Sequence, residues 1–502
     1  MKIWGLAGLA GMIVLSGCAS LVPQPFSAAD VASQAQQDRQ TAALGVEPII
    51  GPVRLEEAIA RALKYNLQRR TRMMEEALAV SQLDVGQYDM LPKVTAAAGY
   101  SHRSEYLTTR AIDSVTGAPS LANPSISSDK NHRIADLGLS WSLLDFGLSY
   151  YTAKQNADRV LIAAERRRKA MHLLIQDVRT AFWRTAGAQK LRGDVRKSIA
   201  LAEEALTDAG KAEGERIRSP LDSLRYQRQL LENVRLLEAI DHDLATARVE
   251  LAHLINAPLS LDLVVAETDD KVSRQLLDMP VEAMESTAIL RNGDLREEFY
   301  GARIAREETH KILLRMFPNL SFSFDSRHDD DRFLVHHRWN EAAAQLSFNL
   351  VNLLSAPAQK RMADAGVALA DQRRIAAQMA TLAQVHVARL QYASAYQQFI
   401  RADAIYAVDD RIGKIIGAGE RAQTQSKLDR VSSDTTTILS LLRRYQALAQ
   451  LHAAASKLQA TMGLEPEVPS VRESSLAQLT AVASEFLRQT QGELPAARPA
   501  GQ

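Results

Sequence analysis

Four short stretches of the chain alternate between apolar positions and small or polar positions. After Pro92, the even positions from Val94 to Tyr100 are apolar or small and the odd ones are polar or small. The same alternation follows Pro318 in LSFSFD, and recurs later in LGLSWSL and AQLSFNL. A period of two with one apolar face is typical of β-strands, and about ten residues is the length of a membrane-crossing strand. We predict strands over about 93–106, 134–144, 319–326 and 340–350.

Long helices are predicted after the second strand of each pair. Small apolar residues there recur every seven positions, which indicates the seam of a coiled coil. The seam residues are Ala157, Ala164, Met171 and Val178. We predict an unbroken helix over 151–211, roughly 90 Å long, then a turn within 210–220 and a returning helix over 221–255. The sequence of the second half predicts the same arrangement of a long helix, a turn and a returning helix, with the turn at 413–419.

The two halves of the chain repeat each other. The spacing from Asn66 to Pro92 equals that from Asn292 to Pro318, and LSWSLLDFG resembles LSFNLVNLL. Landmarks at fixed spacing indicate an internal duplication, with insertions confined to loops. The predicted parts are a first repeat over 54–258, a connecting segment over 259–280 and a second repeat over 281–466. One continuous helix is predicted before each proline, over 55–89 and 282–315, and polar loops are predicted at 107–133 and 326–339.

The two ends of the chain carry separate signals. A basic residue and an apolar run ending in LSGC predict a secretory signal peptide over 1–17. This tetrapeptide resembles the lipobox of bacterial lipoproteins, which implies cleavage before Cys18 and acylation of that cysteine, the only one in the chain. Residues 18–53 are then a lipid-anchored linker. The tail over 467–502 holds one possible helix, 475–491, which either packs on the other helices or is disordered.

Composition excludes several classes of function. A net charge of +1 gives no reason to expect a nucleic-acid partner. No nucleophile–base set or metal-ligand spacing is present, so we expect no enzyme, no metal and no cofactor beyond the lipid on Cys18. Three histidines and three aspartates between residues 328 and 337 are better explained as a solvated loop than as a metal cluster. The basic run 166–169 likewise favours a solvated helix face over an anion site.

The predicted strands cannot remain an open sheet in lipid, because the polar groups at their edges would be unpaired. Four strands are also too few to close a barrel, for which about eight is the minimum. Several chains must therefore pool their strands: two copies would give a barrel filled by side chains, and three a wider barrel with a water-filled pore. We predict a mixed α and β fold, with long antiparallel coiled-coil helices and a shared transmembrane β-barrel.

The repeated pattern ALxxN…LP, then LSWSLLDFG, then G-x-R…LD-x-L resembles the TolC-type outer-membrane efflux family over about residues 55–466. This resemblance implies a homotrimer with a 12-stranded β-barrel in the outer membrane and a helical barrel across the periplasm. It also implies a periplasmic adaptor protein and an inner-membrane pump of RND or ABC type as partners, in tripartite efflux or type I secretion. The subunit would be a passive, gated exit duct. The resemblance does not identify the substrate that it transports.

The same resemblance implies a gate at the helix turns. The sequences that resemble the family's tips are Gly214-Glu215-Arg216 and Gly419-Glu420-Arg421, followed by Leu221-Asp222 and Leu428-Asp429. By that match Asp429 would form a three-fold ring at the entrance, which attracts cations. Arg421 would hold the tip closed by pairing with a carboxylate such as Asp222, and Arg216 is its counterpart in the first repeat. Gly214 and Gly419 would mark the adaptor-docking tips. Extra residues between the two motifs leave open which arginine pairs.

A different class of function is also compatible with long helices and a lipidated cysteine. The alternative is a periplasmic coiled-coil lipoprotein that binds partners without forming a pore. The four alternating stretches distinguish the two, because a scaffold has no use for apolar strand faces that carry Trp141, Phe322 and Phe348. Conductance in planar bilayers separates the two hypotheses.

Overall fold

The computed structural model describes residues 24–110, 112–119, 124–214, 220–267, 274–466 and 474–491. The chain divides into two compact units, residues 1–48 and 49–502. The first contains helix α2 (Ala28–Ala43), whose N-terminus is capped because Ser27 Oγ accepts a hydrogen bond from the backbone N–H of Asp30. None of the described residues of α2 is buried. The predicted signal peptide and Cys18 lie outside the described residues.

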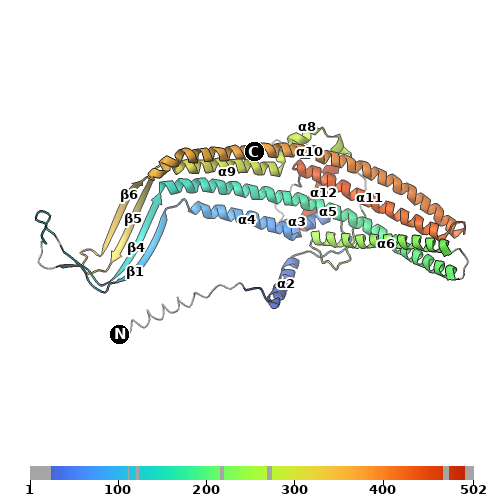
Figure 1. Cartoon of the computed structure of the whole chain (residues 1–502), viewed down its shortest axis with the longest axis horizontal. Helices are drawn as coiled ribbons and strands as arrows, with labels where there is room; N and C mark the ends of the chain where they lie inside the picture. The colour runs from blue at the N-terminus through green and yellow to red at the C-terminus, as the bar shows by residue number, and fades with distance from the viewer. Residues whose placement is uncertain are drawn as a thin grey trace. The chain divides into compact units, whose positions relative to one another are not determined.

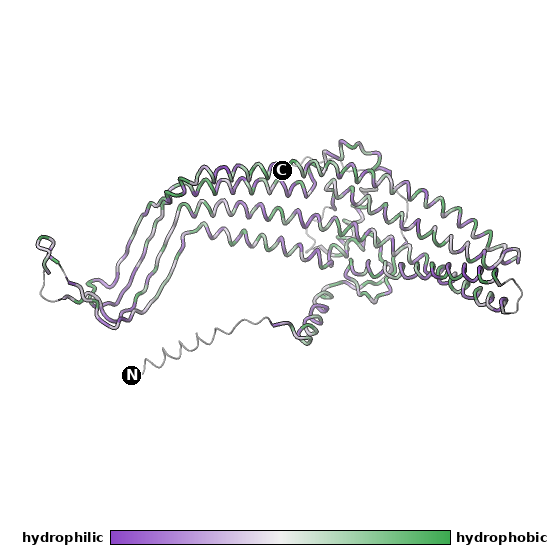
Figure 2. Tube along the Cα trace, in the orientation of Figure 1, coloured by the Kyte–Doolittle hydropathy of each residue, from purple (hydrophilic) through white to green (hydrophobic). Residues whose placement is uncertain are grey.

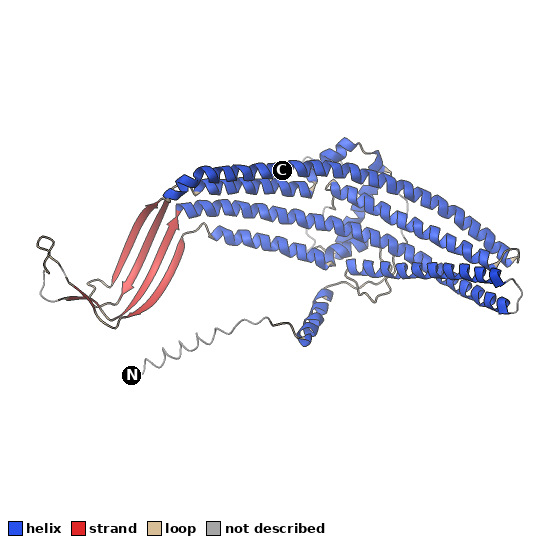
Figure 3. Ribbon diagram, viewed as in Figure 1, coloured by secondary structure: helices blue, strands red, loops and turns tan. Residues whose placement is uncertain are grey.

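The second unit contains a four-stranded antiparallel sheet whose strands come from both halves of the chain (Figure 3). Its strands are β1 (Lys93–His102), β4 (Asn131–Ser142), β5 (Asn319–Asp329) and β6 (Arg338–Ser347). They lie in the order β1-β4-β5-β6, so the four predicted strands are confirmed. The pairing of β4 with β5 joins the two halves, with Trp141 opposite Phe322 and Leu139 opposite Phe324. Strands β1 and β6 form the two edges.

Two of the strands stop sooner than predicted because helix caps follow them. Ser142 Oγ accepts a hydrogen bond from the backbone N–H of Asp145 and ends β4 at the first turn of a helix. Asn349 accepts a hydrogen bond from the backbone N–H of Val351 and does the same after β6. A capping side chain fixes where a helix starts, so strand structure cannot continue past it. The predicted continuations to about 144 and 350 are wrong.

Strand β1 also ends before the predicted position, at His102 rather than about 106. A second, two-stranded sheet begins just beyond it, where β2 (Leu107–Thr109) pairs with β3 (Ser125–Ser128). The hydroxyl groups of Ser125 and Ser127 donate to backbone carbonyl oxygens of β2, at 3.2 and 3.0 Å. The segment predicted as a loop over 107–133 therefore carries a short hairpin.

The single helix predicted before each proline is in fact two helices. Before Pro92 these are α3 (Leu55–Tyr65) and α4 (Leu67–Tyr88), and before Pro318 they are α8 (Val281–Arg291) and α9 (Gly293–Leu314). Asn66 and Asn292 cause the breaks, because both have extended backbone angles. Each side-chain oxygen caps the helix that follows, at 3.0 Å from the backbone nitrogen of Arg69 or Leu295.

Four long helices extend from the sheet or return toward it (Figure 1). They are α5 (Leu143–Gly214), α6 (Pro220–Leu254), α10 (Leu350–Arg421) and α11 (Lys427–Thr461). Both α5 and α10 have 72 residues, and both α6 and α11 have 35, so the long helices of the two halves correspond in length and order. At about 1.5 Å per residue, α5 and α10 each span roughly 110 Å. The unbroken helix agrees with the prediction. The first predicted turn falls on residues 215–219, which lie outside the described residues.

The second turn lies beyond the predicted region 413–419. Gly413 and Gly417 belong to α10, where they leave room for side chains of α11: a Cβ on Gly417 would overlap the guanidinium of Arg430. These glycines serve close packing of two helices rather than chain reversal. The turn forms after Arg421, with Gln423 at a positive φ of 59°.

The main hydrophobic core lies where both halves of the chain meet, around the middle of the long helices. It is built from α3, α5, α6, α8, α10, α11, the short helix α7 (Gln275–Asp278) and the helix α12 (Leu476–Gln491). Helix α12 confirms the helix predicted in the tail. Its largest buried members include Phe182, Trp183, Tyr392, Leu448 and Leu458. Of the predicted seam, Met171 and Val178 are buried and Ala157 and Ala164 are half-buried.

Hydrophobic and hydrophilic residues alternate along the long helices (Figure 2). No helix within the described ranges combines the length and apolarity that a membrane crossing needs.

Candidate functional site

The turn between α10 and α11 lies at the end of the helices away from the sheet (Figure 1). Ser426 caps α11: its Oγ accepts a hydrogen bond from the backbone N–H of Asp429 at 3.1 Å. The Asp429 carboxylate accepts a return hydrogen bond from the backbone N–H of Ser426 at 3.2 Å. This reciprocal capping box holds Asp429 in the first turn of α11. The motif S-x-x-D at residues 426–429 is typical of a capping box, so this structural role of Asp429 could have been predicted from the sequence.

Asp429 also lines a cavity of about 280 Å³ between α10 and α11. Asp409 of α10 lines the same cavity, together with Ile412, Ile416 and hydroxyl side chains of α11. Neither carboxylate forms an ion pair with any described residue. Two carboxylates without ion-pair partners that face one cavity produce a negative potential, which attracts cations.

The arginines predicted at the gate have different surroundings. Arg421 donates from Nε to the carbonyl oxygen of Gly417, one turn earlier in α10, at 3.1 Å. Asp222 is exposed in the first turn of α6, and no ion pair joins it to Arg421 among the described residues of this single chain. Gly419 lies in the last turn of α10. Gly214 ends α5, and Arg216 lies outside the described residues. The pairing of Arg421 with a carboxylate stays a prediction for contacts between copies.

Lys427 makes the tip contact that sequence reasoning missed. Its Nζ lies 2.9 Å from Glu204 Oε1 and 2.7 Å from Asp208 Oδ2, so the first residue of α11 pairs with two carboxylates of α5. The hydrogen bonds donated to Asp208 and then to Glu204 raise the pKa of Lys427. Glu204 and Asp208 lie one turn apart on α5, but nothing local in the sequence indicates which lysine faces them. We call this three-residue contact the tip latch.

A small apolar cluster lies next to the tip latch. Ala202 and Ala205 of α5, Leu230 of α6 and Val431 of α11 are all buried there, with Leu428 packed against them. Burying these side chains joins the two helical hairpins independently of charge. The tip is therefore held by an apolar contact and by an ion pair that salt can screen.

The basic run 166–169 is only partly a solvated face, because all four of its side chains form ion pairs. Each of its four side chains pairs with an acidic side chain brought from elsewhere in the sequence. The pairs are Arg166 with Glu297, Arg167 with Glu76, Arg168 with Glu465 and Lys169 with Asp294. These partners lie on α9, on α4 and just after α11. The predicted solvated face holds for Arg166 and Lys169, which stay exposed, but not for Arg167 and Arg168, which are partly buried where helices meet.

The core contains a buried arginine that binds a histidine rather than a carboxylate. Arg179 is 3% exposed, and its Nη2 lies 3.1 Å from Nδ1 of His452 on α11. His452 stacks on Trp183 with ring centroids 4.9 Å apart. Burial and then the charge of Arg179 hold the pKa of His452 well below its usual value. His452 is therefore neutral at pH 7 and accepts a hydrogen bond from the guanidinium at Nδ1.

The histidine and aspartate loop is organised by hydrogen bonds. The buried carboxylate of Asp331 accepts hydrogen bonds from the hydroxyl of Ser128 and the backbone N–H groups of Asp129 and Phe333. His132 Nδ1 lies 2.7 Å from the Asp329 carboxylate. Among the described residues, no group of three or more acidic, histidine or cysteine side chains is arranged to hold a metal ion.

Comparison with solved structures identifies the fold. The channel CmeC of Campylobacter jejuni matches with a TM-score of 0.65 at 11% identity, covering 93% of this chain and 98% of that one. The open state of the MtrE channel of Neisseria gonorrhoeae matches with 0.60 at 15% identity, covering 84% and 94%. The outer-membrane channel OprN matches with 0.62 at 16% identity, covering 82% and 89%. The chain has the fold of the TolC-type outer-membrane channels.

The TolC-type resemblance seen in the sequence is thus confirmed for the fold. No family model and no curated protein matches the chain. The TolC-type fold was recognisable because its landmarks mark ends of elements: asparagines at helix breaks, prolines ahead of strands and a capping serine or asparagine at each return to helix.

Proposed function

We propose that three copies of this chain form a TolC-type exit duct, with the four-stranded sheets joined into a 12-stranded barrel in the outer membrane. The observation that carries this proposal is the register of the sheet. Val94, Leu139, Phe324 and Ala342 lie side by side across all four strands. The next row is Thr95, Gly138, Asp325 and Glu341. One face is thus apolar and the other polar, as lipid on one side and a water-filled pore on the other require.

The two edges of the sheet support closure by further copies. All ten residues of β6 are exposed, and β1 is exposed along nearly its whole length. The sheet has no layer of helices or strands packed on either face among the described elements. Such a sheet is unstable alone in water. In lipid the backbone N–H and C=O groups of its edge strands would lack hydrogen-bond partners, whereas a closed barrel pairs them all.

The finer parts of the proposal follow from the family resemblance. Cys18 carries the lipid anchor, and the two repeats arose by duplication, in keeping with their equal helix lengths. The long helices cross the periplasm as a helical barrel, and the tips dock on an adaptor joined to an RND or ABC pump. Asp429 and Arg421 form the gate, and the cavity shared by Asp429 and Asp409 supports a cation-attracting entrance.

Oligomer mass and conductance test the duct. Purified protein in detergent is expected to have the mass of a trimer and to open channels in planar bilayers that prefer cations. A conducting trimer supports the proposal. A monomer that inserts no channels contradicts it and favours the periplasmic scaffold. A Cys18→Ala variant that still conducts when reconstituted separates the lipid anchor from the pore.

A further inference from the structure

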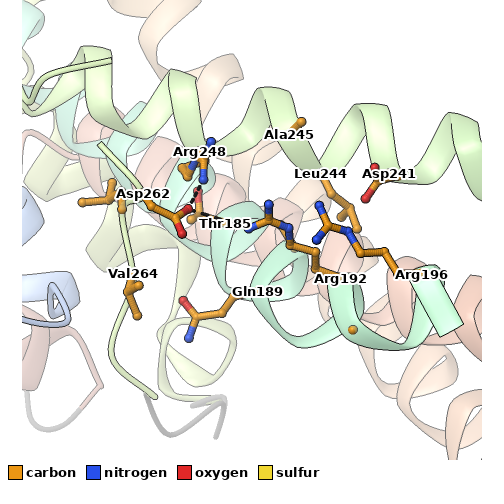
Figure 4. A pocket seen from close by; sticks show the side chains of 13 residues that line it. Thr185, Gln189, Arg192, Arg196, Asp241, Leu244, Ala245, Arg248, Asp262 and Val264 are labelled. Atoms are coloured by element: carbon orange, nitrogen blue, oxygen red, sulfur yellow. Dashed lines mark hydrogen bonds and ion pairs between the residues drawn. The ribbon is translucent and has the colours of Figure 1, made fainter. Parts of the chain in front are cut away.

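A cavity of about 450 Å³ lies between α5, α6 and the segment 259–267 that follows α6 (Figure 4). Its charged lining consists of Arg192 and Arg196 from α5, Arg248 and Asp241 from α6, and Asp262 from the segment. We call it the arginine cavity. It lies apart from the tip, and a ligand can bind there whether or not the chain forms a duct.

The three guanidinium groups are incompletely paired. Arg248 forms an ion pair with Asp262, and Arg192 Nη1 is 3.7 Å from the same carboxylate. Arg196 forms no ion pair with any described residue. The Nε of Arg248 is buried without a hydrogen-bond partner among the described groups. Arg196, and the nitrogens of Arg192 that Asp262 does not contact, are therefore the donors that the cavity offers to a further acceptor.

The closeness of the two arginines of α5 also favours the binding of an anion. Arg192 and Arg196 are one helical turn apart on the same face, where like charges repel. The only carboxylates in the lining are Asp262, which is shared by two arginines, and Asp241, which forms no ion pair with any described residue. An anion placed among the arginines relieves the repulsion. Asp241 opposes it and limits the charge that the cavity accepts.

The wall that carries Asp262 is held in place by backbone hydrogen bonds. The side-chain amide of Gln189 both accepts from and donates to the backbone of Val265, at 3.0 and 3.2 Å. Val53 pairs with the other side of this segment, at 2.9 Å to Val264 and 2.8 Å to Ala266. The cavity is therefore formed before any ligand arrives, which lowers the entropy cost of binding.

We propose that the arginine cavity binds a small divalent oxyanion, a phosphate or a dicarboxylate, between Arg192, Arg196 and Arg248. The planar guanidinium fork matches the paired oxygens of a carboxylate or phosphate group. Asp262 already occupies one such position on Arg248. The ligand takes the remaining donors, namely those of Arg196 and the nitrogens of Arg192 that Asp262 does not contact.

Thermal unfolding of the full chain in detergent tests this site at pH 7.5 and constant ionic strength. Inorganic phosphate and succinate, each titrated against chloride, are expected to raise the unfolding midpoint to a plateau, and acetate is not. Arg196→Ala is expected to weaken the apparent affinity for phosphate about tenfold, which is about 1.4 kcal/mol. Arg235→Ala is the matched control, because Arg235 lies on α6 and pairs with Glu232 of the same helix. It is expected to leave the affinity unchanged.

Asp262→Asn provides the second arm of the test. Removing the resident carboxylate is expected to tighten phosphate binding, because it frees Arg248 and lowers the opposing charge. Phosphate also stabilises proteins by exclusion from their surface, an effect that rises without a plateau. A response without a plateau, an equal response in Arg196→Ala, or weaker binding in Asp262→Asn overturns the proposal.

Discussion

Asn292 joins the start of α9 to the end of α11: its Nδ2 donates to the carbonyl oxygen of Thr461 at 2.9 Å. Asn66 makes the same contact in the first half, donating to Leu254 at the end of α6 at 3.1 Å. Each asparagine ends one helix, caps the next and satisfies a terminal carbonyl of a third. One buried side chain thus fixes the relative position of three helices in each half.

Replacing Asn292 with alanine is expected to lower the free energy of unfolding by about 1–3 kcal/mol, since both the helix cap and the buried hydrogen bond to Thr461 are lost. Asn292→Ser keeps an N-cap oxygen but removes the amide donor, so its loss is expected to be intermediate. Circular dichroism during thermal unfolding measures the order. Ser286→Ala, at an exposed position on α8, is the control. Equal stability of the alanine and serine variants would show that the helix cap contributes nothing.

The tip latch is expected to restrain the ends of α5 and α11. In Lys427→Gln the contacts with Glu204 and Asp208 are lost, and amide hydrogen exchange near residues 200–214 and 427–440 is expected to quicken by up to about fivefold. High salt should produce part of the same change in the unaltered chain, because it screens the ion pairs. Lys414→Gln removes a lysine that pairs within α10 and serves as control. No difference between the two variants contradicts the latch.

Asp429 is expected to set cation preference at the entrance. Asp429→Asn keeps an oxygen that can accept the hydrogen bond from Ser426 and removes only the charge, whereas alanine would also break the capping box. Reversal potentials in planar bilayers should show the cation preference roughly halved. Asp364→Asn makes the same charge change at an exposed position of α10 away from the tip. Unchanged selectivity removes Asp429 from this role.

Arg421 is expected to help keep the tip closed by contacts between copies. Arg421→Ser should raise single-channel conductance, because a cation that pairs with a neighbouring carboxylate is lost. Arg411→Ser is a close control: Arg411 also donates from Nε to a carbonyl one turn earlier in α10. If both variants conduct alike, Arg421 has no special role in closure.

Stability is expected to fall as pH drops from 7 to 5. Burial, and then Arg168, lower the pKa of His172 to about 4, and burial and Arg179 lower that of His452 well below 6.5. Since the unfolded chain takes up these protons near 6.5 and the folded chain does not, stability is complete above 6.5 and is lost below it. The loss is about 1.4 kcal/mol per pH unit for each histidine.

The variant His452→Gln checks this dependence. It is expected to flatten the decline of the unfolding midpoint between pH 7 and 5, and a second change, His172→Gln, to flatten it further. His386 is exposed and pairs with Glu285, so His386→Gln is the matched control. A decline of the same slope in all three variants would assign the pH dependence to other groups.

Much of the fold could be read from local patterns along the chain. Alternation with a period of two located all four strands of the main sheet, and heptad spacing from Met171 to Val178 located the long helix. The repeated spacing of Asn66 and Asn292 ahead of prolines marked equivalent points in the two halves. These signals are legible because hydrophobic periodicity and helix caps act within a few residues.

Tertiary structure alone decided which distant residues meet. The sequence predicts a solvated face for the basic run 166–169, but does not show that its side chains pair with Glu76, Asp294, Glu297 and Glu465 from other parts of the chain. Lys427, the arginine cavity and the alignment of Val94 with Phe324 across β4 likewise depend on long-range packing. A sequence pattern specifies a face of a helix or strand, because that face follows from backbone geometry. Its partner is chosen by the register and packing of elements hundreds of residues apart, which no local pattern contains.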